Sequence, residues 1–313
     1  MILDAQTLMP AAAVDVLVRG AAERALPGTL KTELHASVVE LTTPICASLE
    51  DAVACLRALR GAAAEIAAAN GLAVAAAGAH PTAPLESLPI VQEERYLSMI
   101  RDVGRAARRQ GVNGLHVHVG VESAEQCWER LEAVLAWLPL VLALSVNSPF
   151  VDGRPTGTLS NRAAILAELP RAGAPPAFGS YEAWEAWVER LVGLGVMDDY
   201  TRIWWDVRPH PRLGTLEVRI ADQPTSLERT ELLVRIVRDL VADAPAAVAD
   251  RGDYLQNRWA AATRGIDALL IHPDGTRMAT ARELLGADPP EPEAFAQLRA
   301  GDVAADLVAR TLG

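Results

Sequence analysis

The chain has 313 residues, half of them apolar, so it is long enough to bury one large core or two smaller ones. Its formal net charge of -11 at pH 7 argues against nucleic acid or an anionic membrane as a partner, because both attract basic surfaces. Three cysteines without a CxxC spacing exclude a disulfide framework and a structural zinc site, and they favour a reducing, cytoplasmic location.

Helices are predicted along most of the chain. Residues 50–70 have the apolar spacing of an amphipathic helix, with Ser48 as its N-cap and Asn70-Gly71 as its stop. The same spacing predicts helices over residues 94–110, 123–138, 181–194 and 226–242. No stretch is long and apolar enough to cross a bilayer, and the N-terminal residues lack the basic and apolar regions of a signal peptide.

Short strand-like segments lie between these helices, over residues 72–77, 115–121, 202–208 and 215–221. This alternation predicts an α/β or α+β layered fold. Pro/Gly-rich joints at residues 170–179 and 286–292 are too short to need a domain boundary. We therefore expect residues 1–313 to form a single domain, and the sequence leaves open whether it forms a homo-oligomer.

The first polar segment, KTELHASVVELTTP, contains the only lysine of the chain, Lys31. Its surroundings lack the GxxxxGK[ST] pattern of a P-loop, so any ATP must be bound by another arrangement of groups. Strand alternation places Glu33 and Glu40 on opposite faces, and a bulge or turn is needed to bring both into one site. Glu33 is either a surface carboxylate or a ligand, whereas Glu40, flanked by apolar residues, is expected to be buried and functional.

In LHVHVGV, alternation places His116 and His118 on one face, roughly 7 Å apart and beside Gly120. Two imidazoles next to a glycine suit a metal or a phosphate that approaches closely. The alternative is a pair of solvent-facing histidines on a half-exposed strand. The sequence HVHVGVE also matches the HxHxxxE ligand core of a metal-dependent cupin, and HxH occurs in amidohydrolase barrels, so these two classes are further alternatives.

The segment ALSVNSPFVDGRPTGTLSNR leads into a polar, Gly/Pro-rich loop of the kind that commonly holds substrate. It contains Asn147 and Ser160, and its Arg162 either forks onto a substrate carboxylate or only starts the following helix. The loop chemistry alone does not choose between these two roles.

Residues 202–221 are predicted to form a hairpin, because the sequence PHPRLG interrupts the strand pattern. Alternation gives Glu217 and Arg219 one shared face, and it likewise gives Asp206 and Arg208 a shared face. Burial of such charges costs on the order of several kcal/mol unless they pair with each other or with a ligand. The hairpin therefore carries either a structural ion pair or part of a binding site.

Seven motifs in this order resemble the glutamate-cysteine ligase type 2 family, also called the carboxylate-amine ligases. They extend from Glu33 to Asp267 and read ELHASVVELTTPIC, AGAHP, ERY, HVHVGV, ALSVNSPFVDG with TGTLSNR, WWDVRPHPRLGTLEVRIAD and NRWAAATRGID. No one of these motifs is decisive, but their common order makes a chance match hard to obtain.

The resemblance implies an α+β fold like that of glutamine synthetase, with a curved, mainly antiparallel sheet and helices packed on its outer face. It implies an ATP-dependent ligase that joins a carboxylate, expected to be L-glutamate, to an amine through an acyl phosphate. Mg²⁺ or Mn²⁺ would neutralise the phosphates. The partners would then be small molecules rather than nucleic acid or membrane.

The resemblance also assigns roles to the candidate residues. The expected metal ligands are His116, Glu217, Glu40 and Glu33; the catalytic residues are Arg219, Arg208 and His118; the substrate contacts are Arg162, Asn147 and Ser160; and the nucleotide contacts are Arg219, Arg264 and Asn257.

The family's usual first strand, of the type GVEEEF, has no counterpart in this sequence, and the C-terminal region is shorter than usual. The resemblance therefore implies a domain that is N-terminally truncated relative to the family. A weakly active or non-catalytic relative that binds nucleotide is the main alternative function.

Overall fold

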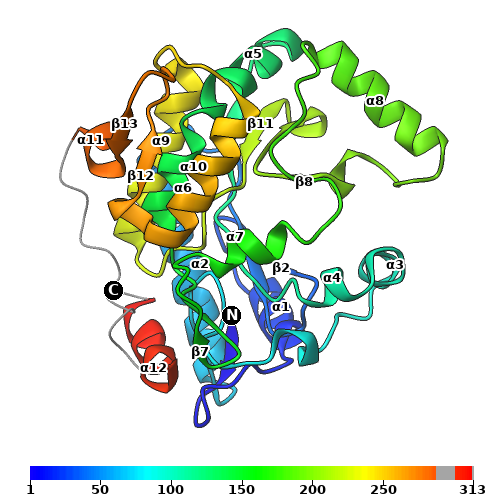
Figure 1. Ribbon diagram of the computed structural model, residues 1–313. Helices are drawn as coiled ribbons and strands as arrows, with labels where there is room; N and C mark the ends of the chain where they lie inside the picture. The colour runs from blue at the N-terminus through cyan, green and yellow to red at the C-terminus, as the bar shows by residue number, and fades with distance from the viewer. Residues whose placement is uncertain (287–299, 312–313) are drawn as a thin grey trace.

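A computed structural model of the chain describes residues 1–286 and 300–311 (Figure 1). Helices and short strands alternate along these residues, which confirms the predicted α+β class. The described part of the joint at residues 286–292 is Gly286, and residues 287–292 lie outside the described ranges. No helix in the described part of the chain is long and apolar enough to cross a bilayer.

The largest sheet among the described residues has three antiparallel strands and is called the central sheet here. Its order is β10 (Val207–His210), β11 (Thr215–Val218) and β5 (Val117–Gly120), so β11 is paired on both edges. The register sets Glu217 of β11 opposite Arg208 on one side and His118 on the other. The predicted hairpin of β10 and β11 is confirmed, and its turn ends at Gly214, whose φ of 62° is a left-handed conformation that suits glycine.

The remaining strands form pairs of two to four residues each. Four pairs are antiparallel and one, β8 with β9, is parallel. They are β1 (Ile2–Asp4) with β4 (Leu72–Val74), β2 (Thr29–Thr32) with β3 (Val39–Thr42), β6 (Phe150–Val151) with β7 (Arg154–Pro155), β12 (Leu269–Ile271) with β13 (Met278–Thr280), and β8 (Ala172–Gly173) with β9 (Trp204–Trp205). The larger curved sheet that the resemblance implies is thus present only as separate small sheets among the described residues, and it stays a prediction.

The helices cover the sheets and connect them. The longest is α2 (Leu49–Ala68), and the shortest is the single turn α4 (Arg105–Arg108). The others are α1 (Val14–Ala22), α3 (Glu94–Val103), α5 (Ala124–Leu135), α6 (Leu138–Ser145), α7 (Asn161–Leu166), α8 (Tyr181–Gly193), α9 (Leu227–Asp243), α10 (Arg251–Arg264), α11 (Ala281–Leu285) and α12 (Ala300–Arg310).

Local sequence signals locate the helix ends well. Ser48 caps α2 by accepting a hydrogen bond from the Asp51 backbone N–H, and Ser226 caps α9 in the same way. The helix predicted over residues 94–110 is wrong as a single element, because Gly104 takes a φ of 68° and separates α3 from α4. The helix predicted over residues 123–138 ends early, at Leu135, and Pro139 lies in the first turn of the next helix, α6.

The main hydrophobic core lies behind the central sheet. Apolar side chains of the sheet, including Val117, Leu216 and Val218, pack against α5, α6, α9 and α10, and Figure 1 shows the last three side by side. A second core joins α1, α2 and β2 in the N-terminal part of the chain. Helix α2 also packs against α9, so the two parts of the chain that hold these cores are in contact, and the single domain over residues 1–313 remains our prediction.

Leu142 of α6 has no exposed surface and lies in the middle of the main core. We expect Leu142→Ala to reduce the free energy of unfolding by about 2–5 kcal/mol, because the truncation leaves a cavity that the helices around it cannot close. Urea denaturation would measure the loss. The matched control is Leu194→Ala, since Leu194 is 67% exposed and should change stability by about 0.5 kcal/mol or less. Equal effects in the two variants would contradict this description of the core.

Candidate functional site

The candidate site is organised around Glu217, whose side chain is 3% exposed. Arg208 donates from Nε to its Oε2 at 2.7 Å, across the β10–β11 pair. Arg219 donates from Nη1 to its Oε1. The predicted shared face of Glu217 and Arg219 is confirmed by this contact, and one carboxylate therefore stands between two guanidinium groups.

Two histidines approach the same carboxylate: His118 on β5 and His116 directly before β5. His116 Nδ1 lies 3.6 Å and His118 Nε2 3.7 Å from Glu217 Oε1, so their predicted shared face is confirmed. Their side chains are 38% and 32% exposed, which leaves both accessible at the rim of the site. His118 Nδ1 is also 3.0 Å from the Thr215 hydroxyl, which fixes the ring on the sheet.

The charges of this cluster do not cancel. Burial opposes ionisation of Glu217, but the positive charges of Arg219 and Arg208 outweigh it and hold the pKa of the carboxyl far below its usual range. Loss of solvent on the covered side of the ring, then the charge of Arg219, lowers the pKa of His116, so its imidazole is neutral near pH 7 although 38% of the side chain stays exposed. Burial lowers the pKa of Arg208 to about 10, which still leaves it protonated. Two guanidinium charges face one carboxylate, and the remaining positive charge suits an anion.

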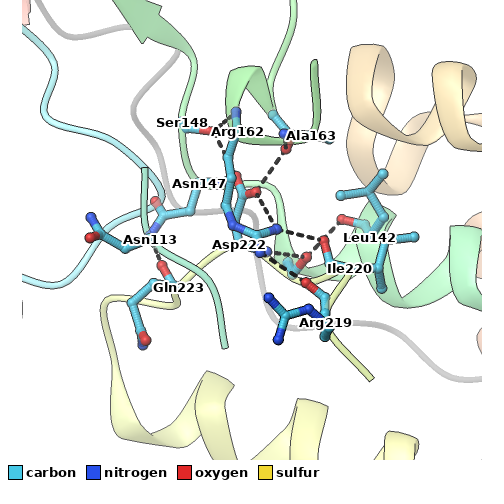
Figure 2. A network of polar contacts seen from close by, with 12 residues as sticks. Asn113, Leu142, Asn147, Ser148, Arg162, Ala163, Arg219, Ile220, Asp222 and Gln223 are labelled. Carbon is cyan, nitrogen blue, oxygen red and sulfur yellow. Dashed lines mark hydrogen bonds and ion pairs between the residues drawn. The ribbon is translucent and has the colours of Figure 1, made fainter. Parts of the chain in front are cut away.

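Arg162, predicted to contact a substrate carboxylate, is buried instead among protein groups (Figure 2). Its Nη1 donates to the Ile220 carbonyl at 3.0 Å and its Nη2 to the Arg219 carbonyl at 2.9 Å. Its guanidinium also lies 4.0 Å from Asp222. These contacts do not favour the predicted role, and they point to a role within the fold.

Asp222 is a residue of the site that the sequence analysis missed. It is fully buried and accepts hydrogen bonds from the Asn147 N–H at 2.9 Å, the Ser148 hydroxyl at 2.7 Å and the Ser160 hydroxyl at 2.8 Å. Asn147 and Ser160, predicted as substrate contacts, are therefore gathered around this carboxylate. Its signal in the sequence was a lone acidic residue directly after the apolar residues of LEVRIAD.

Asp206 and Arg208 do not form the shared polar face that alternation predicts. The chain bends at Asp206, between β9 and β10, so the strand pattern is interrupted there. Asp206 accepts hydrogen bonds from the Tyr254 hydroxyl at 2.7 Å and Arg258 Nε at 2.6 Å, both on α10, whereas Arg208 pairs with Glu217. Arg258 was also missed, because its pairing with Asp206 depends on how α10 packs.

The predicted nucleotide contacts on α10 have different surroundings. Asn257 is buried, and its amide exchanges two hydrogen bonds with the Ile271 backbone, at 2.8 and 2.7 Å. This side chain holds β12 against α10, which does not favour a contact with nucleotide. Arg264 is exposed in the last turn of α10, and its predicted role stays a prediction.

Glu33 directly follows β2, and Glu40 lies on its partner strand β3. The expectation that Glu40 is buried is wrong, because it is exposed on β3, where it faces Lys31 across the pair. Glu33 is half-buried and accepts a hydrogen bond from the Leu34 N–H at 2.7 Å. Burial raises the pKa of Glu33 against that hydrogen bond, and the charge of Glu40 raises it further.

The described residues do not fit a resident metal ion as they stand. No group of three or more His, Cys, Asp or Glu side chains among them is arranged to hold one. Both oxygens of Glu217 are occupied by arginines, and the Arg219 Nη1 lies 3.4 Å from His116 Nδ1. The expected ligands His116 and Glu217 are therefore neighbours, but with Glu33 and Glu40 they do not make a metal centre.

The structure defines an α+β protein in which two arginines of the central sheet region surround one buried carboxylate. The sequence matches the model of "Glutamate-cysteine ligase family 2(GCS2)" over residues 1–300, and the chain belongs to that family.

Several relatives share much of the sequence. Two proteins of Rubrobacter xylanophilus, named "Putative glutamate--cysteine ligase 2-1" and "2-3", are each 41% identical, over 82% and 87% of this chain and 69% and 76% of their own lengths. A protein of Herpetosiphon aurantiacus, named "Putative glutamate--cysteine ligase 2", is 38% identical over 77% of this chain. The matched segment spans 65% of that relative's length.

We expect Glu217→Gln to lower the free energy of unfolding by about 3–5 kcal/mol, because it leaves Arg208 and Arg219 without their buried counter-charge. Denaturant unfolding at neutral pH would measure the change. Glu132→Gln is the control, since Glu132 pairs with Arg251 where both side chains are 23–29% exposed, and it should cost about 1 kcal/mol or less. A Glu217→Gln protein as stable as the wild type would show that the carboxylate does not hold the cluster together.

Proposed function

We propose that this protein joins the carboxylate of glutamate to an amine in an ATP-dependent reaction of the glutamate-cysteine ligase type. The observation that carries the proposal is the cluster of Arg208, Arg219 and Glu217, in which two guanidinium groups face one buried carboxylate in a member of this family. A glutamine synthetase-like arrangement of the sheets belongs to the same proposal.

The reaction would proceed in two displacements. A carboxylate oxygen of glutamate attacks the γ-phosphorus of ATP, the bond to the β,γ-bridging oxygen breaks, and ADP leaves. The amine nitrogen then attacks the acyl carbon, phosphate leaves with the bonding electrons, and the amine loses a proton. The divalent cation enters as MgATP, as part of the substrate, and neutralises charge on the phosphates.

The protein's contribution would be to hold negative charge in place. Arg219 is close to the accessible histidines and would meet the transferring phosphoryl group, where preorganised donors have their largest effect. His116 and His118 would offer neutral imidazoles to the same group. Arg208 also donates to the carbonyls of Thr201 and Ile203, so its role would be to hold Glu217 rather than to touch substrate.

The names of the relatives suggest the substrates to test. They name glutamate and cysteine, and we propose both for this chain, in a cytoplasmic setting that supplies ATP. A second candidate is a family member that binds nucleotide with little turnover. One observation favours it, namely that no group of three metal-binding side chains is assembled among the described residues.

MgATP should raise the thermal midpoint of the protein, because a ligand that binds only the native state stabilises it by mass action, by about 2.7 kcal/mol at a hundred times its Kd. We expect Arg219→Gln to remove most of the shift. Arg212→Gln is the matched control, since Arg212 lies in the turn of the same hairpin but is 69% exposed and pairs with Asp199 at the surface. Equal shifts in both variants would remove Arg219 from the nucleotide site.

Turnover would be measured as ADP release that depends on both glutamate and cysteine. We expect release in the wild type and a fall of at least about 100-fold in kcat for Arg219→Gln, the range seen when one donor to a developing charge is removed. A thermal shift with MgATP but no glutamate-dependent ADP release would reject the ligase and favour the second candidate.

A further inference from the structure

The peptide of Arg219 is held from both sides. Its N–H donates to the Asp206 carbonyl at 2.8 Å, and its carbonyl accepts from Arg162 Nη2 at 2.9 Å. Each of these two neighbours belongs to a buried arginine–aspartate pair, Asp206 with Arg258 and Arg162 with Asp222. The backbone of Arg219 is therefore hydrogen-bonded to one member of each pair, to the main chain of Asp206 and to the side chain of Arg162.

In the pair of Arg162 and Asp222, the arginine has little freedom to move. Asp222 is held by hydrogen bonds from three donors and has no exposed surface, and Arg162 is 4% exposed. Both Nη groups of Arg162 donate hydrogen bonds to consecutive carbonyls, those of Arg219 and Ile220. A Cβ added at Gly114 would lie 2.1 Å from Arg162 Nη2, so the backbone of Gly114 closes the remaining side of the guanidinium.

The pair of Asp206 and Arg258 is connected to the pair of Arg162 and Asp222. Arg258 donates from Nε to Asp206 at 2.6 Å and from Nη2 to the Ala163 carbonyl at 2.9 Å. Ala163 follows Arg162 in α7, so Arg258 of α10 braces the helix from which Arg162 projects. The Tyr254 hydroxyl completes the surroundings of Asp206 at 2.7 Å. A residue of each pair is thus hydrogen-bonded to the backbone at residues 219–220, since Asp206 contacts the Arg219 N–H and Arg162 contacts the Arg219 and Ile220 carbonyls.

We propose that Arg162, Asp222, Asp206 and Arg258 are positioning residues that fix the direction of the Arg219 side chain, and that Arg162 does not bind the substrate carboxylate. The proposal rests on the proposed function, because it takes Arg219 as the group that meets the transferring phosphoryl. Buried ion pairs are costly compared with apolar packing, so their presence here is better explained by precise placement than by stability. A shift of about 1 Å at a catalytic group can cost on the order of 100-fold in rate.

The two roles for Arg162 predict different kinetics. An arginine that binds the substrate carboxylate contributes to ground-state binding, so its loss raises the KM for glutamate. An arginine that only holds the Arg219 side chain in position affects the contact between Arg219 and the transferring phosphoryl group in the transition state. Its loss therefore lowers kcat and leaves the KM for glutamate unchanged.

The first test is Arg162→Lys, which keeps the charge opposite Asp222 but cannot donate in a fork to two carbonyls at once. We expect hydrogen exchange in the segment of residues 218–222 to become at least about tenfold faster, as local opening becomes easier. We expect kcat for glutamate-dependent ADP release to fall at least about tenfold, with the KM for glutamate changed by less than about twofold. Arg251→Lys is the control, because Arg251 also joins a carboxylate and backbone carbonyls, but away from residues 218–222.

A second variant guards against a folding defect in the first. Gly114→Ala keeps all four charged residues, and the three atoms nearest its added Cβ all belong to the Arg162 guanidinium, so it should reproduce the faster exchange and the lower kcat. Gly61→Ala is its control, since a Cβ added at Gly61 meets nothing within 4 Å. It should leave both exchange and kcat as they are in the wild type.

Unchanged exchange at residues 218–222 in both Arg162→Lys and Gly114→Ala would overturn the proposal. So would a raised KM for glutamate with an unchanged kcat, since it would return Arg162 to the substrate. A wild-type protein that releases no ADP would reject the proposed function instead, and the exchange rates alone would then decide whether the pairs hold the Arg219 backbone.

Discussion

Burial of Glu217 between two arginines is the constraint on which the rest of the site depends. A carboxylate with 3% of its side chain exposed is stable only if strong partners replace water, and Arg208 and Arg219 do so. The position on the central strand β11 makes this pairing possible, because Arg208 is its cross-strand neighbour and Arg219 is two residues along the same face. One carboxylate cannot neutralise two guanidinium groups, and the positive character of the site follows.

The two faces of the central sheet differ in character, one apolar and one polar. One face of the central sheet joins α5, α6, α9 and α10 in the main core, and the other face carries the histidines and arginines. Rigid support behind a polar face is a suitable basis for a binding site, since side chains on strands are placed more accurately than side chains on loops. The chain as a whole is acidic, and the two arginines are a local concentration of positive charge within it.

Sequence patterns predicted what depends on neighbours along the chain. The alternation of LEVRIAD and HVHVGV predicted correctly that Glu217 shares a face with Arg219 and that His116 faces the same way as His118. It could not predict contacts that depend on how distant elements pack: the bend that turns Asp206 toward α10, or the approach of Arg162 to Asp222 across 60 positions of sequence. Glu40 was expected to be buried because its neighbours are apolar, but apolar neighbours on a short two-stranded pair do not by themselves exclude solvent.

The hydrogen bond from Arg258 to the Ala163 carbonyl has a consequence for how such proteins can diverge. It links the two arginine–aspartate pairs through α7, because Arg162 projects from that helix and Arg258 donates to it. Groups joined in one network are expected to be coupled, so loss of one pair should weaken the effect of the other. Drift that removes one acidic partner would relax selection on the remaining three charged residues together. Family members should therefore either retain all four or replace them as a set, and a sequence with only half of them would mark a lineage in transition.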